Sequence, residues 1–69
     1  MKINKGDLLI VRNEQGNVHW TATVMHVGEI AVFIKYRWLL PEQSAYKDAD
    51  LDIEEFECLV NDPAHELIQ

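Results

Sequence analysis

The chain of 69 residues carries 12 Asp and Glu residues against 6 Lys and Arg residues, so its formal net charge is −6 at pH 7. A chain this short allows a single domain, residues 1–69, and its core supplies only about 3–5 kcal/mol of stability. The single cysteine excludes an internal disulfide, and no ligand set for structural zinc is evident, so we expect no metal and no cofactor.

The sequence contains no segment typical of membrane insertion or secretion. Its apolar runs are far shorter than the roughly 18–20 residues that a spanning helix needs, and its first residues are charged. A lone thiol is typical of proteins in a reducing compartment. We therefore expect a cytoplasmic protein with no membrane partner.

Charge is distributed unevenly along the chain. All 6 basic residues lie within residues 1–47, whereas residues 48–69 hold eight of the 12 acidic residues. Binding to nucleic acid phosphates requires clustered Lys and Arg, so this pattern disfavours direct binding to nucleic acid. It favours either a basic protein partner or folding of the acidic segment onto the basic body, and a solvated acidic face is the simplest interpretation.

The first half of the chain predicts three strands in succession. Asp7–Arg12 is a short apolar run rich in strand formers, and Asn13–Asn17 is a turn in which Gly16 can adopt a positive φ. Val18–Val27 is dominated by β-branched and aromatic residues, and a two-residue turn separates it from a third strand, Ile30–Leu39. Consecutive strands with tight turns predict an antiparallel meander.

The period of two along a strand assigns side chains to faces. In the second strand, the set that we expect to face the core is Val18, Trp20, Ala22 and Val24. In the third strand, one face carries Ile30, Val32, Ile34, Tyr36, Trp38 and Leu40.

The second half of the chain is less regular. Pro41–Asp50 has no sustained period and is predicted to be a loop anchored by Tyr46. Leu51–Val60 is compatible with a strand or a helix, and we favour a turn followed by a short closing strand, Phe56–Val60. The Asp-Pro pair at residues 62–63 resembles an N-cap followed by proline, so residues 61–69 are predicted to form a C-terminal helical turn.

Three short motifs carry a resemblance to a known group of folds. They are Lys5-Gly6-Asp7, Trp20-x-Ala22-x-Val24 and Phe33-Ile34-Lys35-Tyr36. With the order of the predicted elements, residues 5–60 resemble the SH3-like small β-barrels of the Tudor and chromo-like group. The resemblance implies a mainly β fold: an antiparallel barrel made of a three-strand meander, a loop and a short closing strand.

The same resemblance implies a ligand. Tudor-like domains hold methylated Lys or Arg in an aromatic cage, because ring faces attract cations. By resemblance Tyr36 is a cage candidate, and the other large rings that could join it are Trp20, Trp38 and Tyr46.

The sequence offers no support for an enzyme. Ser44 is the only serine, and the three histidines have no spacing that predicts a catalytic triad or a metal site. Cys58 lies among apolar residues and is expected to be an inert packing residue. The Asp-x-Asp-x-Asp run that begins at Asp48 fails as a calcium loop, because its sixth and twelfth positions are Ile53 and Leu59.

The leading hypothesis is therefore a non-enzymatic module that binds a protein partner or itself, as a homodimer, through an aromatic edge. Aromatic residues and Arg commonly carry the binding energy of interfaces. The binding residues that we expect are Tyr36, Arg37, Trp38, Leu40 and Tyr46.

The acidic segment supports an alternative hypothesis. Its charges could mimic nucleic acid phosphates, as in accessory proteins of phages or mobile elements that block a basic groove. The acidic surface comprises Asp48, Asp50, Asp52, Glu54, Glu55 and Glu57. The chain would then be a competitor or adaptor for a nucleic-acid-handling protein, and the cage for a modified cation is a third hypothesis.

Overall fold

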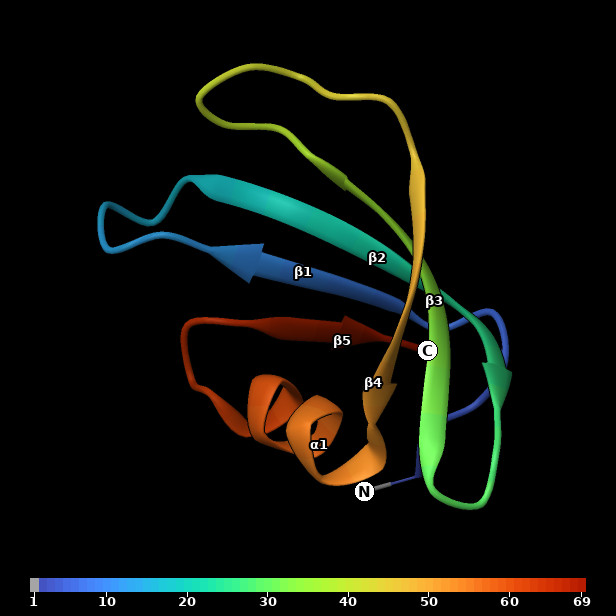
Figure 1. The fold of residues 1–69 in the computed structure, drawn as a ribbon. Coiled ribbons are helices and arrows are strands. Elements are labelled where there is room, and N and C mark those ends of the chain that lie inside the picture. The colour runs from blue at the N-terminus through green and yellow to red at the C-terminus, as the bar shows by residue number, and fades with distance from the viewer. Residues whose placement is uncertain (1) are drawn as a thin grey trace.

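The computed structural model describes residues 2–69, which form a mainly β domain with one helix (Figure 1). Its elements, in chain order, are β1 (Leu8–Arg12), β2 (Val18–Val27), β3 (Ala31–Trp38), β4 (Lys47–Asp52), α1 (Ile53–Asn61) and β5 (Glu66–Ile68). The predicted mainly β fold with its three-strand meander is confirmed. No helix in the described part of the chain combines the length and apolar character needed to cross a bilayer.

The strands form one antiparallel sheet in the order β4-β3-β2-β1-β5. The sheet curls on itself, as Figure 1 shows, and α1 lies beside β4 and β5 at its open side. The edge strands β4 and β5 do not pair with each other within residues 2–69, so the sheet is open and is not closed into a barrel.

The core lies on the inner face of the curled sheet, which we call the concave face. Its buried side chains come from β1, β2, β3 and α1: Leu9, Val11, Ala22, Val24, Val32, Ile34, Phe56 and Val60. The faces predicted for residues 20–24 of the second strand and 32–38 of the third are confirmed, because Ala22 and Val24 lie opposite Tyr36 and Ile34 in the ladder and share their side of the sheet. Ile30 and Leu40 lie outside β3, and Ile30 is 78% exposed, so the predicted face does not extend to them.

The first turn also forms as predicted. Gly16 has a φ of 85°, a value that costs glycine little because it has no Cβ. Its N–H donates to the Asn13 carbonyl oxygen at 2.9 Å. Asn13 Oδ1 accepts from the N–H groups of Gln15 and Asn17, each at 3.0 Å.

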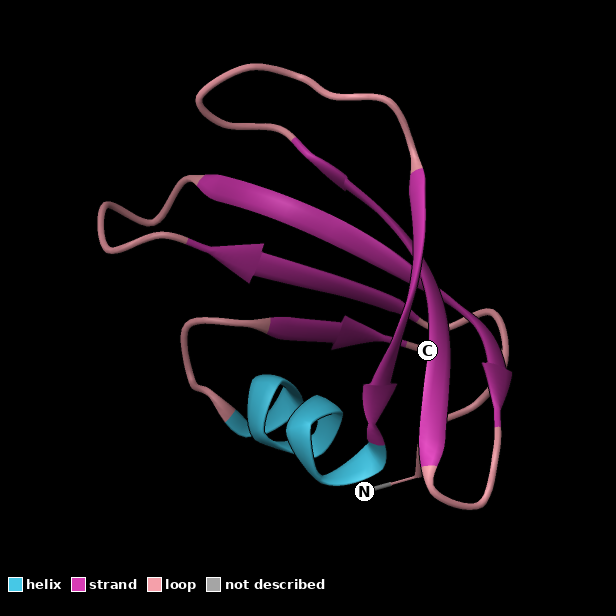
Figure 2. Cartoon of the chain, in the orientation of Figure 1, coloured by secondary structure: helices cyan, strands magenta, loops and turns pink. Residues whose placement is uncertain are grey.

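The second half of the chain departs from the predictions (Figure 2). The end of the predicted loop Pro41–Asp50 belongs to β4, which pairs with β3. The predicted strand Phe56–Val60 is wrong, because these residues lie in α1. Phe56 and Val60 are four residues apart, so a helix presents both to the concave face, where both are buried.

The predicted C-terminal helical turn is also wrong. Asp62 caps a single reverse turn instead: its Oδ1 accepts from the Ala64 N–H at 2.9 Å, and its carbonyl accepts from the His65 N–H at 3.0 Å. This turn directs Glu66–Ile68 along β1 as β5. The backbone groups at the edge of β1 thereby gain hydrogen-bond partners that a local helix would not supply.

Candidate functional site: an aromatic groove on the concave face

Part of the concave face remains uncovered beyond the core. A cavity of about 220 Å³ lies there, and residues from β2, β3, β4 and α1 form it. The side chains that line it are all aromatic or aliphatic: Trp20, Ile34, Tyr36, Trp38, Ala49, Leu51 and Leu59. We call this cavity the aromatic groove.

The register between β2 and β3 places three rings together in the groove. Trp20 lies directly opposite Trp38, and Ala22 lies opposite Tyr36. The centroids of Trp20 and Trp38 are 5.8 Å apart, those of Trp20 and Tyr36 are 6.0 Å apart, and those of Tyr36 and Trp38 are 6.3 Å apart. The interplanar angles are 57°, 71° and 86°, so the rings are mutually inclined, an arrangement that aromatic pairs favour.

Trp38 differs from the other two rings in its contacts. Trp20 and Tyr36 pack against the buried core, whereas Trp38 is not among the described side chains that do so. Trp38 instead lies against the other two rings and against His19, whose ring centroid is 4.9 Å away. Trp20, which we expected in the core, is half-buried and serves both the core and the groove.

The predicted binding residues divide between the two faces of the sheet. Tyr36 and Trp38 line the groove, but β3 lies between β2 and β4 and is not an edge strand. Arg37 lies on the opposite, convex face, where its guanidinium donates to Tyr46 Oη at 3.2 Å and sits 4.8 Å from the ring centre of Tyr46. Leu40 follows the end of β3, and its N–H donates to the His19 carbonyl at 3.2 Å.

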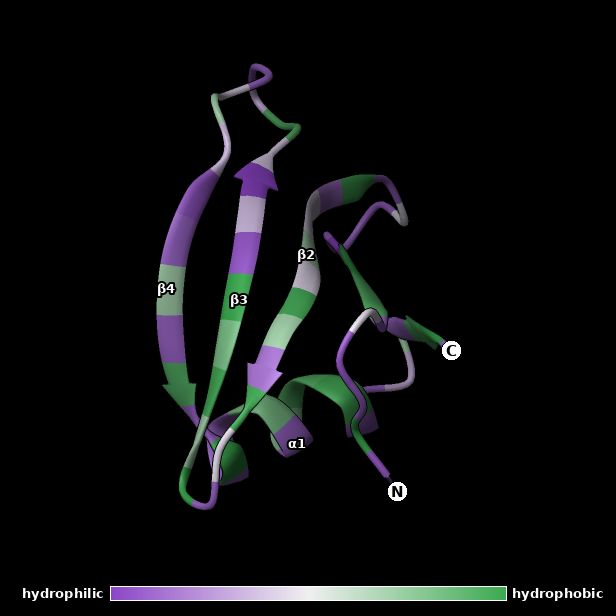
Figure 3. Ribbon diagram, turned by 90° about the vertical axis from the view of Figure 1, so that its right-hand side faces the viewer, coloured by the Kyte–Doolittle hydropathy of each residue, from purple (hydrophilic) through white to green (hydrophobic). Residues whose placement is uncertain are grey.

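Three groove residues were missed by the sequence analysis. Ala49 and Leu51 come from β4, and Leu59 comes from α1. The signal for the first two was present, because Ala49 and Leu51 alternate with acidic residues at the period of a strand. Figure 3 shows the same alternation as hydrophilic and hydrophobic bands along β4.

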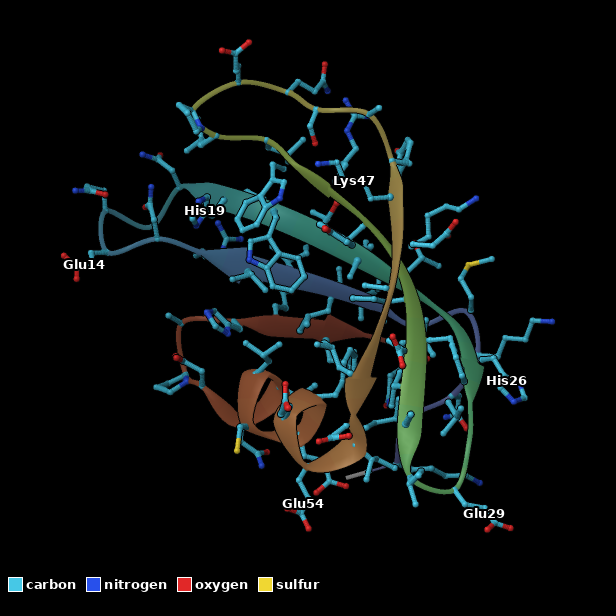
Figure 4. All side chains as sticks on the ribbon, in the orientation of Figure 1. Glu14, His19, His26, Glu29, Lys47 and Glu54 are labelled. Atoms are coloured by element: carbon cyan, nitrogen blue, oxygen red, sulfur yellow. The ribbon has the colours of Figure 1, made fainter. Side chains whose placement is uncertain are left out.

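The six acidic residues do not form one surface. Asp48, Asp50 and Asp52 are exposed on β4, where the alternation places them on the convex face, opposite the groove. The other three, Glu54, Glu55 and Glu57, are exposed on α1, and Figure 4 shows Glu54 pointing away from the sheet. Within residues 2–69, the close contacts between a carboxylate and an Arg or His side chain join Arg12 to Glu66 and His65 to Asp62, and so leave these six carboxylates out.

A second hollow, of about 370 Å³, has a mixed lining. Two carboxylates contribute to it together with apolar side chains, and the residues that line it are Met25, Phe33, Ile34, Asp48, Ala49 and Asp50. Met25 and Phe33 are 42% and 44% exposed, so this hollow offers apolar surface beside negative charge. We call it the acidic hollow.

The remaining polar side chains are dispersed. His19 lies against Trp38, His26 against Phe33, and His65 Nδ1 lies 2.9 Å from the Leu59 carbonyl oxygen. In the described chain, no three or more His, Cys, Asp and Glu residues are grouped in a way that could hold a metal ion. Cys58 is exposed, so the prediction that it packs in the core is wrong; α1 directs it outward.

Comparison of the chain with protein-family models, with curated proteins and with solved structures returned no match. The function of this domain is therefore inferred from its geometry.

Proposed function

We propose that this domain is a non-enzymatic protein-interaction module that binds an apolar segment of a protein partner in the aromatic groove. The observation that carries the proposal is the set of three inclined, half-buried rings lining a cavity that the helix leaves uncovered. Trp and Tyr are enriched among the residues that dominate interface energies, because they bury a large rigid area at little cost in side-chain entropy.

The lining of the groove indicates what it accepts. All seven lining residues are aromatic or aliphatic. A cation would gain attraction from the inclined rings, but no carboxylate in the lining would offset its lost hydration. The lining thus favours an uncharged apolar side chain over the modified cation of a Tudor-like cage.

The test is selection from a displayed peptide library, followed by affinity measurement on purified peptides. We expect the selected peptides to share aromatic or aliphatic residues, and we expect Trp38→Ala to weaken their binding by about tenfold or more. Because Trp38 lies outside the core contacts, the variant should keep its fold, which circular dichroism and urea unfolding would check.

Tyr46→Ala is the matched control. Tyr46 is an aromatic residue with 61% of its surface exposed, and it is not part of the groove lining. Peptides selected by the groove should bind Tyr46→Ala as they bind the native chain. The proposal would be contradicted if the selected peptides bound Trp38→Ala as tightly as the native chain, or if the selected peptides shared no sequence pattern.

A further inference from the structure

Strand β4 has a free edge whose unpaired backbone groups can be identified. Among residues 2–69, β4 pairs with β3 alone. The Ile53 N–H donates to the Ile30 carbonyl at 3.0 Å, and the ladder continues from there without a shift in register. Hydrogen-bonded and non-hydrogen-bonded pairs alternate in an antiparallel ladder, so Leu51 and Ala49 direct their backbone groups toward β3. The backbone N–H and C=O groups of Asp48, Asp50 and Asp52 therefore point outward.

The two faces beside this edge differ in chemistry. On the concave face, Ala49 and Leu51 line the aromatic groove. On the convex face, Asp48 and Asp50 line the acidic hollow next to apolar side chains of β2 and β3. A strand added along β4 would send alternate side chains to these two faces.

We infer, building on the proposed function, that the partner is an extended segment that pairs antiparallel with the free edge of β4 and alternates Lys or Arg with apolar residues. The basic residues lie opposite Asp48 and Asp50, where cross-strand pairs of opposite charge are favourable. Their aliphatic stems pack on the apolar part of the acidic hollow while the charged ends reach the carboxylates. The apolar residues lie opposite Ala49 and Leu51 and enter the aromatic groove.

The same charges oppose a second copy of this chain as the occupant. Pairing of β4 with β4 of another copy would set rows of carboxylates against each other, and like charges across a ladder are destabilising. Strand β5, at the other edge, also carries an acidic residue, Glu66. The carboxylates therefore protect the edge from self-pairing and at the same time select a basic partner.

The first experiment uses a labelled synthetic peptide of eight residues that alternates Lys with Val and Tyr, with binding followed by fluorescence anisotropy. We expect it to bind, and we expect the same peptide with Glu in place of Lys to bind at least about tenfold more weakly. Combining Asp48→Asn with Asp50→Asn should weaken binding of the Lys peptide by about tenfold. The matched control combines Glu54→Gln with Glu55→Gln, which removes the same charge from α1 and should leave affinity within about twofold.

The second experiment tests backbone pairing. In the inferred register the N–H groups of the Lys residues point at β4, and those of the apolar residues point away. N-methylation of the Lys residues should therefore weaken binding by at least about tenfold, and N-methylation of the apolar residues should leave it unchanged. Equal effects at both sets of positions would overturn the inference.

The outcomes separate this inference from the proposed function. One outcome is that Trp38→Ala weakens peptide binding, whereas neither the aspartate substitutions nor the position of the N-methyl groups changes the affinity. That outcome would overturn strand addition and leave the groove as the binding site. Failure of every peptide to depend on Trp38 would overturn both.

Discussion

At the residue scale, Asp7 is the buried acidic residue of the described chain, with 5% of its surface exposed. Its Oδ2 accepts from the Asn4 N–H at 2.8 Å, and Gln69 Nε2 lies 3.4 Å from the same oxygen. Its backbone carbonyl accepts from the Val24 N–H at 2.9 Å. Asp7 thus joins the N-terminal turn to β2 and to the last residue of the chain.

Replacing Asp7 by Ala should lower the free energy of unfolding by about 1–3 kcal/mol, because the Asn4 N–H would lose its acceptor in a partly buried position. Urea unfolding followed by circular dichroism would measure this loss. Glu14→Ala, in the exposed first turn, is the control and should change the free energy of unfolding by less than about 0.5 kcal/mol. Equal effects of the two substitutions would show that the Asp7 contacts contribute nothing.

At the element scale, packing holds α1 in place. A helix of 9 residues is too short to be stable by itself in water. The Asp52 side chain makes no capping hydrogen bond, although Glu54 and Glu55 suit the positive end of the helix dipole. The helix is therefore stabilised mainly by Phe56 and Val60, which close the core at the open side of the sheet.

Phe56→Ala should lower the free energy of unfolding by about 3–5 kcal/mol, because it removes a fully buried ring. This loss is comparable to the whole stability expected of a domain this small, so the variant should be largely unfolded. Phe56→Leu should lower the free energy of unfolding by only about 1–1.5 kcal/mol, and this variant should stay folded, so the two substitutions give a graded comparison. Thermal melting by circular dichroism would measure both, with the exposed Glu57→Ala as control. A Phe56→Ala variant that melts like the native chain would show that α1 is dispensable for the fold.

At the scale of the whole molecule, the charge distribution opposes self-association. The net charge is −6, and the row of Asp48, Asp50 and Asp52 lies on β4, one of the two edge strands that the sheet has within residues 2–69. Exposed edges of this kind pair with other chains unless charge or geometry prevents it. Mutual repulsion between copies should weaken as added salt screens the carboxylates.

We expect the native chain to be a monomer at low ionic strength. When all three aspartates of β4 are replaced by Asn, the average solution mass should increase with protein concentration, because the free edge no longer repels a second copy. Light scattering over a concentration series would measure this. A native dimer that Trp38→Ala dissolves would contradict the expectation and assign the groove to a second copy of the chain.

Local pattern alone determined the first three strands. The β-branched and aromatic residues of Val18–Val27 and the period of two from Val32 to Trp38 placed Val24, Ile34 and Trp38 on the correct face. The first turn also followed from its own residues, because Gly16 and the Asn13 side chain make their contacts within it. Information of this kind is local in the chain, and so it can be read without knowing what packs against it.

Only the tertiary structure decided the remainder. Phe56, Cys58 and Val60 alternate as in a strand, whereas the spacing of Ile53, Phe56 and Val60 suits a helix. Burial of Phe56 and Val60 against the open side of the sheet selects the helix. At the C-terminus, pairing of residues 66–68 with β1 outweighs the helix signal of the Asp-Pro pair. The groove joins β2, β3, β4 and α1, so it exists only once long-range pairing has brought these elements together. Such contacts form between surfaces that are distant in sequence, so the periodicity of a single segment does not predict them.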